Sequence, residues 1–107
     1  MGGNTGGSAL LFAALGDRTR LWLVARLCDS GPMSIASLTV GSRVTRQAIR
    51  KHLQVLEEAG VVRGRRRGRE RIWRLERRRL YEAQRYLDLI SRQWDAALGR
   101  LRDLVEK

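Results

Sequence analysis

The sequence predicts a mainly α fold with one β-hairpin (α+β), and three stretches of the chain support this prediction. Residues 45–59 fit an amphipathic helix, because apolar and long polar side chains fall on opposite sides at about 100° per residue. Residues 61–75 fit a hairpin, since two arginine-rich runs flank Arg67-Gly68. Residues 80–107 fit a long helix, because apolar residues recur at alternating spacings of three and four.

The net charge of the 107-residue chain is +11, and nearly all of it lies in one segment. Residues 43–79 contain fourteen basic and four acidic side chains, whereas residues 1–42 contribute +1 and residues 80–107 contribute nothing. A hydrophobic content of 43% is ordinary for a folded domain, so the basic segment is not a disordered tail. A polyanion is therefore the expected partner.

The chain is expected to divide into three parts. Residues 1–7 are rich in glycine and are expected to be disordered. Residues 8–79 are expected to form the domain that binds the polyanion, and residues 80–107 a dimerisation helix. Three short helices are expected before the amphipathic helix, over residues 9–15, 18–28 and about 35–40, with Ser8, Asp17 and Ser34 as their N-caps.

The chain contains one cysteine, Cys28, which we interpret as a buried small hydrophobe on the second helix. A single cysteine excludes an internal disulfide and fits a reducing cytoplasm. No apolar run approaches the length of a membrane span, and the glycine-rich start does not resemble a signal peptide. We therefore expect a cytoplasmic protein without membrane contact. The second helix is expected to turn one stripe to the core, formed by Leu21, Val24, Ala25 and Cys28 with Leu23 and Leu27 beside it.

The amphipathic helix has an N-cap candidate in Thr45 and a stop signal in Gly60. A short glycine-containing turn joins it to the third helix, which is the layout of a helix-turn-helix unit. Its polar side consists of long donors and amides, the groups that pair with base edges and phosphates. The predicted DNA-binding residues of this unit are Arg43, Thr45, Arg46, Gln47, Arg50, Lys51 and Gln54.

The hairpin is expected to pack on the domain through Val62, Trp73 and Leu75. The planar guanidinium of arginine binds phosphate oxygens in bidentate fashion, so the hairpin is predicted to be a DNA-binding wing. Its predicted DNA-binding residues are Arg65, Arg66, Arg67, Arg69 and Arg71.

The apolar stripe of the last helix is too long for a small domain to cover, which favours a second copy of the chain across a twofold axis. The alternative is a core helix folded back on its own domain. The predicted dimer interface consists of Leu11, Phe12, Leu87, Ile90, Trp94, Ala97, Leu101 and Leu104.

Three segments resemble the ArsR/SmtB family of bacterial winged-helix repressors: FAALGDRTRLWLVARL, TRQAIRKHLQVLEEAGVV and GRERIWRL. The resemblance covers about residues 12–107. It implies a homodimer in which the first and last helices pair, while the fourth helix enters the major groove with the wing beside it. By position it makes Thr45, Arg46, Gln47 and Arg50 the groove-facing residues.

The sequence departs from the branches of this family that sense metals or oxidants. The family's Cys-x-Cys positions are occupied by Ser34 and Ala36, the last helix has no histidine, and Cys28 has no second cysteine to pair with. No metal site and no cofactor are therefore expected. No residue pattern identifies a small-molecule effector.

We expect a dimeric, sequence-specific repressor that binds an inverted-repeat operator in double-stranded DNA. The alternative is an architectural DNA- or RNA-binding protein that uses the same charge without preferring any sequence. The sequence shows no paired acid and base, no phosphate-binding glycine loop and no activated nucleophile, so an enzyme with catalytic residues is not expected. His52, the only histidine, is assigned a core or hydrogen-bonding role.

Overall fold

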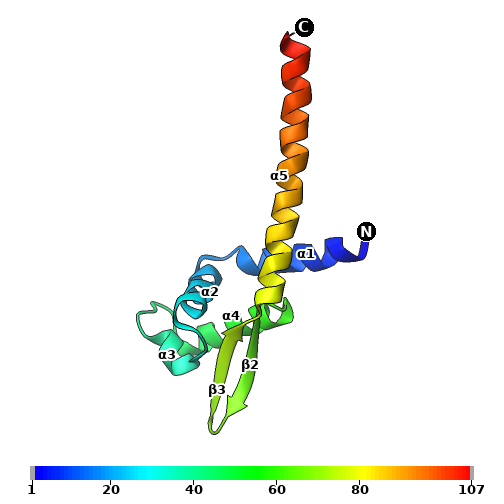
Figure 1. Cartoon of the computed structure of the whole chain (residues 1–107). Coiled ribbons are helices and arrows are strands. Elements are labelled where there is room, and N and C mark those ends of the chain that lie inside the picture. Colours follow the sequence, from blue (N-terminus) through cyan, green and yellow to red (C-terminus); the bar gives the residue numbers. More distant parts are fainter. Residues whose placement is uncertain (1, 107) are drawn as a thin grey trace.

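The computed structural model describes residues 2–106, with the side chains of residues 7–106. The long helix α5 projects from one end of a small body, and the β2–β3 hairpin projects from the other (Figure 1). Three strands form an antiparallel sheet in the order β1-β3-β2. The elements are α1 (Gly2–Leu15), α2 (Arg18–Ser30), β1 (Met33–Ser34), α3 (Ile35–Thr39), α4 (Arg46–Glu58), β2 (Val62–Arg67), β3 (Glu70–Leu75) and α5 (Arg77–Glu106). This is the winged helix-turn-helix fold that the sequence predicted.

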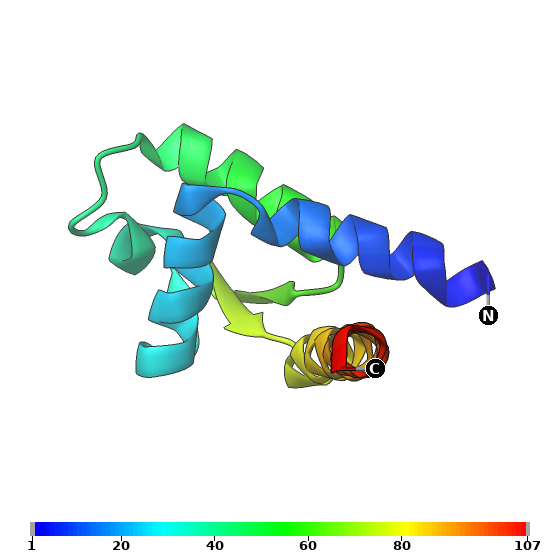
Figure 2. The same ribbon diagram turned by 90° about the horizontal axis from the view of Figure 1, so that it is seen from above.

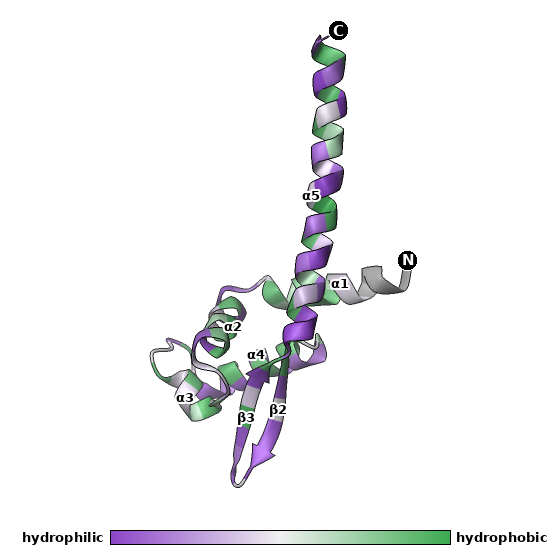
Figure 3. Ribbon diagram, viewed as in Figure 1, coloured by the Kyte–Doolittle hydropathy of each residue, from purple (hydrophilic) through white to green (hydrophobic). Residues whose placement is uncertain are grey.

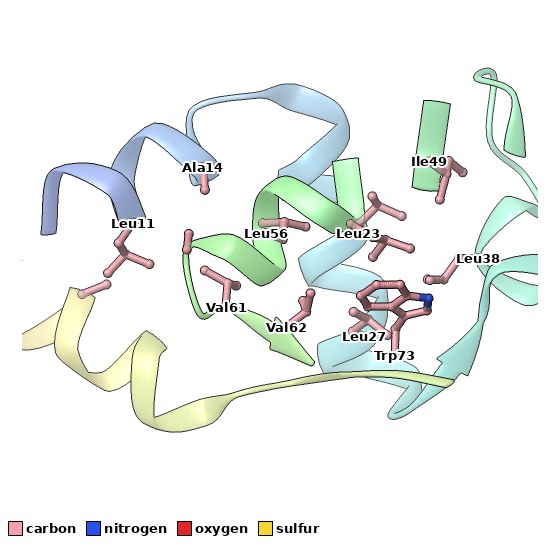
Figure 4. Close-up of a cluster of buried hydrophobic side chains, with 13 residues drawn as sticks. Leu11, Ala14, Leu23, Leu27, Leu38, Ile49, Leu56, Val61, Val62 and Trp73 are labelled. Atoms are coloured by element: carbon pink, nitrogen blue, oxygen red, sulfur yellow. The ribbon is translucent and has the colours of Figure 1, made fainter. Parts of the chain in front are cut away.

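The core of the body lies between α2, α4 and the sheet, with Trp73 near its centre (Figure 4). Trp73 is 1% exposed and extends from β3 toward leucines of the surrounding helices. The predicted packing of the hairpin is confirmed for Val62 and Trp73, which are buried, while Leu75 is half-buried. The fully buried helix residues include Leu23, Leu38, Ile49, Leu53 and Leu56.

Three predicted helix starts are confirmed by their capping hydrogen bonds. The side chains of Asp17, Ser34 and Thr45 accept hydrogen bonds from backbone N–H groups in the first turns of α2, α3 and α4. Gly60, after the end of α4, has φ of 79°, the left-handed conformation that favours glycine at a helix end. Polar capping and glycine chemistry therefore set these boundaries locally.

The predicted core stripe of α2 is wrong. The buried residues are Leu23 and Leu27, whereas Leu21 and Cys28 are exposed. Apolar residues occupy most positions of this helix, so their spacing does not select one face. Its packing against α1, α4 and β3 decides which residues are buried. Cys28 is consequently a surface thiol near the end of α2 and not a buried hydrophobe.

The first helix, α1, begins at Gly2, well before the predicted start at Ala9, and includes residues 2–7, which we expected to be disordered. Glycine has a low helix propensity, so a helix over these glycine-rich residues was not expected. Leu11, predicted at the dimer interface, is instead buried in the core of its own protomer. Phe12 packs on α5 of the same chain, with its ring centroid 5.7 Å from that of Tyr86.

The hairpin matches the prediction except at its turn. Arg67 pairs with Glu70, so the two turn residues are Gly68 and Arg69. Gly68 has φ of 63° at the first turn position, the requirement of a type II′ turn. The short strand β1 was not predicted; Met33 and Ser34 pair with Trp73 and Ile72 of β3 and tie the wing to the helix-turn-helix.

Helix α5 does not fold back on the body, so the alternative left open by the sequence is wrong. The described chain measures 68 × 29 × 20 Å, and its radius of gyration is 18.1 Å, against about 13 Å for a compact domain of this length. Viewed along α5, the helix stands at the edge of the body, where α1 crosses its base (Figure 2). Hydrophobic residues recur along α5 beyond the body (Figure 3).

Candidate nucleic-acid interface

Helix α4 is anchored along its inner side. Ile49, Leu53 and Leu56 are fully buried against the other elements of the body. At its N-terminus, Oγ1 of Thr45 accepts a hydrogen bond from the backbone N–H of Ala48 at 3.1 Å. Buried leucines and a satisfied cap fix both the rotation and the starting point of the helix. The outer side of α4 is therefore presented to solvent in a defined orientation.

The turn that leads into α4 is held by Arg26 of α2. The guanidinium of Arg26 donates hydrogen bonds to the backbone carbonyls of Val40 and Ser37 at the end of α3. The same guanidinium lies 5.2 Å from the centroid of the Trp22 ring, a cation–π distance. Gly41 has φ of 81°, which allows the chain to reverse there. Arg26 thus joins α2 to the end of α3 and to the turn that leads into α4.

The outer side of α4 and the turn before it carry the side chains of this unit that the sequence predicted to bind DNA, and all of them are exposed. Apart from the capping Thr45, none makes a hydrogen bond or ion pair through its side chain within the described part of the chain. Several guanidinium, ammonium and amide groups are therefore available to an external partner. These residues are Arg43, Thr45, Arg46, Gln47, Arg50, Lys51 and Gln54.

His52 belongs to a polar contact behind α4, as the sequence predicted. Its Nδ1 lies 3.2 Å from Nη1 of Arg20 and accepts there, because a guanidinium only donates. Arg20 also donates to the backbone carbonyl of Ala14. The pKa of Asp17 is below its ordinary value, chiefly because its carboxylate accepts a hydrogen bond from the backbone N–H of Arg20, with smaller contributions from nearby positive charge. This cluster joins α1, α2 and α4.

At the root of the wing, acidic side chains neutralise several arginines. Arg63 and Arg74 are directly opposite each other on β2 and β3, an arrangement in which like charges repel. Their Nε atoms lie 3.9 and 3.8 Å from Oε1 of Glu76, which offsets the repulsion. These two arginines therefore belong to the internal electrostatics of the hairpin.

Arg71 is held by the body, although its place in the arginine run predicted a DNA contact. Its Nη2 lies 3.3 Å from Oε1 of Glu57, and its guanidinium stacks 4.6 Å from the centroid of Trp73. Oε2 of Glu57 also accepts a hydrogen bond from the backbone N–H of Gly64 at 3.1 Å. A Cβ atom at Gly64 would lie 2.5 Å from Nε of Arg71, so only glycine leaves room for this stack. Glu57 thereby connects α4 to both strands of the wing.

The tip of the wing has a different environment. Four arginines there are exposed, and none makes a side-chain hydrogen bond or ion pair with another residue that the structure describes. Strand pleating places Arg65 and Arg67 on one face of the hairpin and Arg66 on the other. We call this group the wing tip; it consists of Arg65, Arg66, Arg67 and Arg69.

Arg79, in the first turn of α5, connects three elements of the molecule. Its Nε donates to the backbone carbonyl of Ala59 at the end of α4 at 2.8 Å, and its Nη2 donates to that of Gly7 in α1 at 2.6 Å. Its Nη1 pairs with Oε2 of Glu82 at 2.6 Å. The end of the presented helix is thus fixed to the base of the long helix.

Most of the predicted seam on α5 is uncovered within one protomer. Leu101 and Leu104 are 58% and 71% exposed. A row of large exposed apolar side chains is uncommon on the surface of a monomeric protein. Ala97 is half-buried. The other large seam residues are also exposed, namely Leu87, Ile90 and Trp94.

Two further properties of the described residues bear on function. They contain no group of three or more histidine, cysteine, aspartate or glutamate side chains that could hold a metal ion. Among the helices they form, none is both long and apolar enough to cross a membrane.

Three arginines that hold the interface from behind were not predicted, because in the sequence they cannot be distinguished from surface charge. Arg20, Arg26 and Arg79 all donate to backbone carbonyls of other elements. A weak signal existed for Arg26, which follows Trp22 by one helical turn and can stack on it. No local signal marks Arg79, since its partners lie far away in the sequence.

Comparison with known proteins identifies relatives of similar length. An ArsR-like transcriptional regulator from Rhodococcus sp. RHA1 has 34% sequence identity and a TM-score of 0.83, covering 95% of both chains. The HTH-type transcriptional regulator YuzN of Bacillus subtilis is 38% identical over an alignment of 73 residues that covers 63% of this chain and 79% of YuzN. No family model matches the sequence.

A third likeness concerns the fold alone. The homodimeric winged helix-turn-helix DNA-binding domain Mb0332 of Mycobacterium bovis is 20% identical, with a TM-score of 0.67 over 92% of this chain and 88% of that one.

Proposed function

Because this chain belongs to the ArsR family and is a DNA-binding helix-turn-helix transcriptional regulator, we propose that it is a dimeric repressor of an inverted-repeat operator. In this proposal α4 enters the major groove, and the wing tip contacts the backbone or the adjacent minor groove. The protein acts by binding double-stranded DNA and not by catalysis.

The observation that carries the proposal is the set of unpartnered polar side chains on the outer side of α4. Arginine bonds guanine through two acceptors, and glutamine bonds adenine in the same bidentate way. Arg46, Gln47 and Arg50 occupy the first turns of α4, the part of a recognition helix that meets base edges. Their freedom from internal contacts supports a role in reading bases.

The wing tip supports the phosphate part of the proposal. Its four arginines have no side-chain partner among the described residues, while the arginines at the wing root already have acidic partners. Phosphate contacts set register on the duplex without reading sequence. Arg71 is left out of this contact set because Glu57 and Trp73 occupy its guanidinium.

The apolar seam of α5 supports the dimeric part. One large apolar side chain contributes about 1.5–3 kcal/mol when it is fully buried, so paired seams of this size are sufficient to hold two chains together. The Mycobacterium bovis relative with the same fold is homodimeric. A dimer sets the two recognition helices about one helical turn, or a multiple of it, apart, which requires a palindromic operator.

The alternative is an architectural protein without sequence preference. It would use the same positive charge but would bind duplexes of different sequence with equal affinity. The test is fluorescence anisotropy with two duplexes of equal length, one from the region upstream of the protein's own gene and one with the same bases shuffled. We expect Arg50→Ala to weaken binding to the upstream duplex by about 1–3 kcal/mol and to the shuffled duplex much less.

Arg92→Ala is the matched control, because Arg92 is an exposed arginine on α5 without a described partner. This variant should bind both duplexes like the wild type. Equal losses on both duplexes for Arg50→Ala would contradict base reading and favour the architectural alternative.

A further inference from the structure

A cavity of about 450 Å³ lies where the end of α2, the end of β3 and the start of α5 meet. This volume is within the range of small-molecule sites, roughly 300–1,000 Å³. Its apolar wall is formed by Leu27, Leu75 and Leu80, one from each element. Leu27 is buried and Leu75 and Leu80 are half-buried, so the wall is continuous with the core of the body.

The rim of the cavity is basic. Arg74 and Arg77 line it, and no aspartate or glutamate does. Arg77 is exposed and has no side-chain hydrogen bond or ion pair among the residues that the structure describes. Nε of Arg74 lies 3.8 Å from Oε1 of Glu76, beyond hydrogen-bonding distance, so this guanidinium also retains free donors. Tyr81 adds a hydroxyl and Gln84 an amide to the same rim.

We propose that this cavity binds a small organic anion that has one carboxylate and an apolar body. The guanidinium of Arg77, which has no acidic partner among the described residues, is complementary to a carboxylate, which arginine binds through two parallel hydrogen bonds. Arg74 is paired with Glu76 and adds only the donors that this ion pair leaves free. The leucine wall is complementary to an aliphatic or aromatic body of the ligand. A neutral or cationic molecule of the same shape satisfies only the apolar half of the site.

The position of the cavity gives the ligand a way to act on DNA binding, and this part rests on the proposed function. The cavity touches α2, which packs behind α4, together with β3 of the wing and the base of α5. Leu80 both lines the cavity and begins the apolar spacing that continues along the dimer seam. An occupant therefore biases the angle between α5 and the body, and with it the spacing of the two recognition helices.

The first experiment measures binding to the full-length protein without DNA. Isothermal titration calorimetry is performed with phenylbutyrate, and with phenylbutanol and phenylbutylamine as probes of the same body. We expect saturable binding of phenylbutyrate at one site per chain, and binding of the other two weaker by roughly tenfold or more, because charge-assisted hydrogen bonds are lost.

Two variants of the rim act by different means. Arg77→Gln removes a free guanidinium, and Gln84→Trp fills the cavity without changing charge; each should weaken phenylbutyrate binding by roughly tenfold or more. Arg100→Gln, an exposed arginine far along α5, is the matched control and should bind like the wild type. Absence of saturable binding, equal binding of all three probes, or equal loss in Arg100→Gln would overturn the proposal.

The second experiment separates the cavity from the proposed function. Anisotropy with the upstream duplex is repeated with and without saturating phenylbutyrate, and the acid is expected to change the affinity of the wild type but not of Arg77→Gln. Acid that binds without changing the affinity for the duplex would overturn the regulatory part. A protein that binds the acid but prefers no duplex would refute the proposed function and leave the cavity site intact.

Discussion

Helices of the body (α1 to α4) and the arm, which is the part of α5 (Arg77–Glu106) beyond the body, carry apolar residues at the same helical spacing. These residues are buried in the body and exposed on the arm. In the body, Leu53 and Leu56 of α4 are 0% exposed because α2, the sheet and α1 cover them. On the arm, Leu101 and Leu104 are mostly exposed because no other element of the chain reaches them. The body therefore buries its apolar side chains within one chain, whereas the arm leaves its apolar side chains without a covering surface.

This difference indicates what each region needs in order to be stable. Burial within the chain makes the stability of the body independent of protein concentration. In the proposed dimer, the arm is buried only by association with a second chain, which depends on concentration. Changes in the body should therefore affect folding, and changes on the arm should affect assembly.

The largest effect is expected for Leu101→Asp on the arm. A carboxylate would lie uncompensated in the paired seam, so the dimer should dissociate while the body stays folded. Loss of the second half-site should weaken operator binding by about 100-fold or more. Sedimentation velocity and anisotropy measure the two effects.

Two controls belong to this experiment. Arg92→Asp places a carboxylate on the opposite side of α5 and should leave the dimer intact. Leu53→Ala in the body should lower the free energy of unfolding by about 2–5 kcal/mol, which shows what loss of a core residue looks like. A Leu101→Asp protein that remains dimeric would contradict the division between body and arm.

A smaller effect is expected at the junction of the two regions. Arg79→Ala leaves the carbonyls of Ala59 and Gly7 without their donor, which should lower the free energy of unfolding by about 1–3 kcal/mol. Urea unfolding at fixed protein concentration measures it. Arg78→Ala, at an exposed neighbour without described partners, is the control, and an equal change in both variants would show that the contacts of Arg79 contribute nothing specific.

The wing tip should affect DNA binding without affecting the body. Each phosphate contact contributes about 0.9 to the slope of log K against log salt concentration, so Arg66→Ala with Arg67→Ala should flatten that slope by up to roughly 2. The thermal midpoint should not change, because neither side chain has a partner in the described structure. An unchanged slope would show that these arginines do not reach the DNA backbone.

The smallest effect concerns Asp17, at the start of α2. Its pKa in the folded state is below the ordinary 3.8, so its carboxylate contributes stability above that value and loses the contribution as pH falls through the folded pKa. The stability difference between wild type and Asp17→Asn should therefore shrink as pH is lowered from about 5 to about 2. A difference that is constant across this acid range would contradict the assigned role of the charge.

The sequence was sufficient to predict the elements whose limits depend on local chemistry. The cap at Thr45, the stop at Gly60 and the glycine of the hairpin turn define α4 and the wing, and all three have the expected roles within one residue. The 3-4 spacing on α5 predicted both its helical form and the line of residues that it leaves exposed. Caps, turn glycines and helical spacing could be predicted because they depend on neighbouring residues and not on distant partners.

The sequence could not predict features that depend on distant partners. It did not distinguish Arg71 from Arg66, because Glu57, which holds Arg71, lies on a different element. It selected the wrong face of α2, because most residues there are apolar and the covering elements decide which of them are buried. Leu11 was assigned to the dimer interface for the same reason, since its neighbours in the body were unknown.

A hydroxyl-radical footprint of the wild-type protein on the DNA upstream of its own gene shows whether two recognition helices bind it as a pair. In the proposed dimer, the two chains are joined through the arm and each presents one α4. We therefore expect two protected segments that are related by a dyad and lie about one helical turn, or a multiple of it, apart. The bases between them should form an inverted repeat. Protection of a single segment, or uniform protection that is the same on shuffled DNA, would contradict the account.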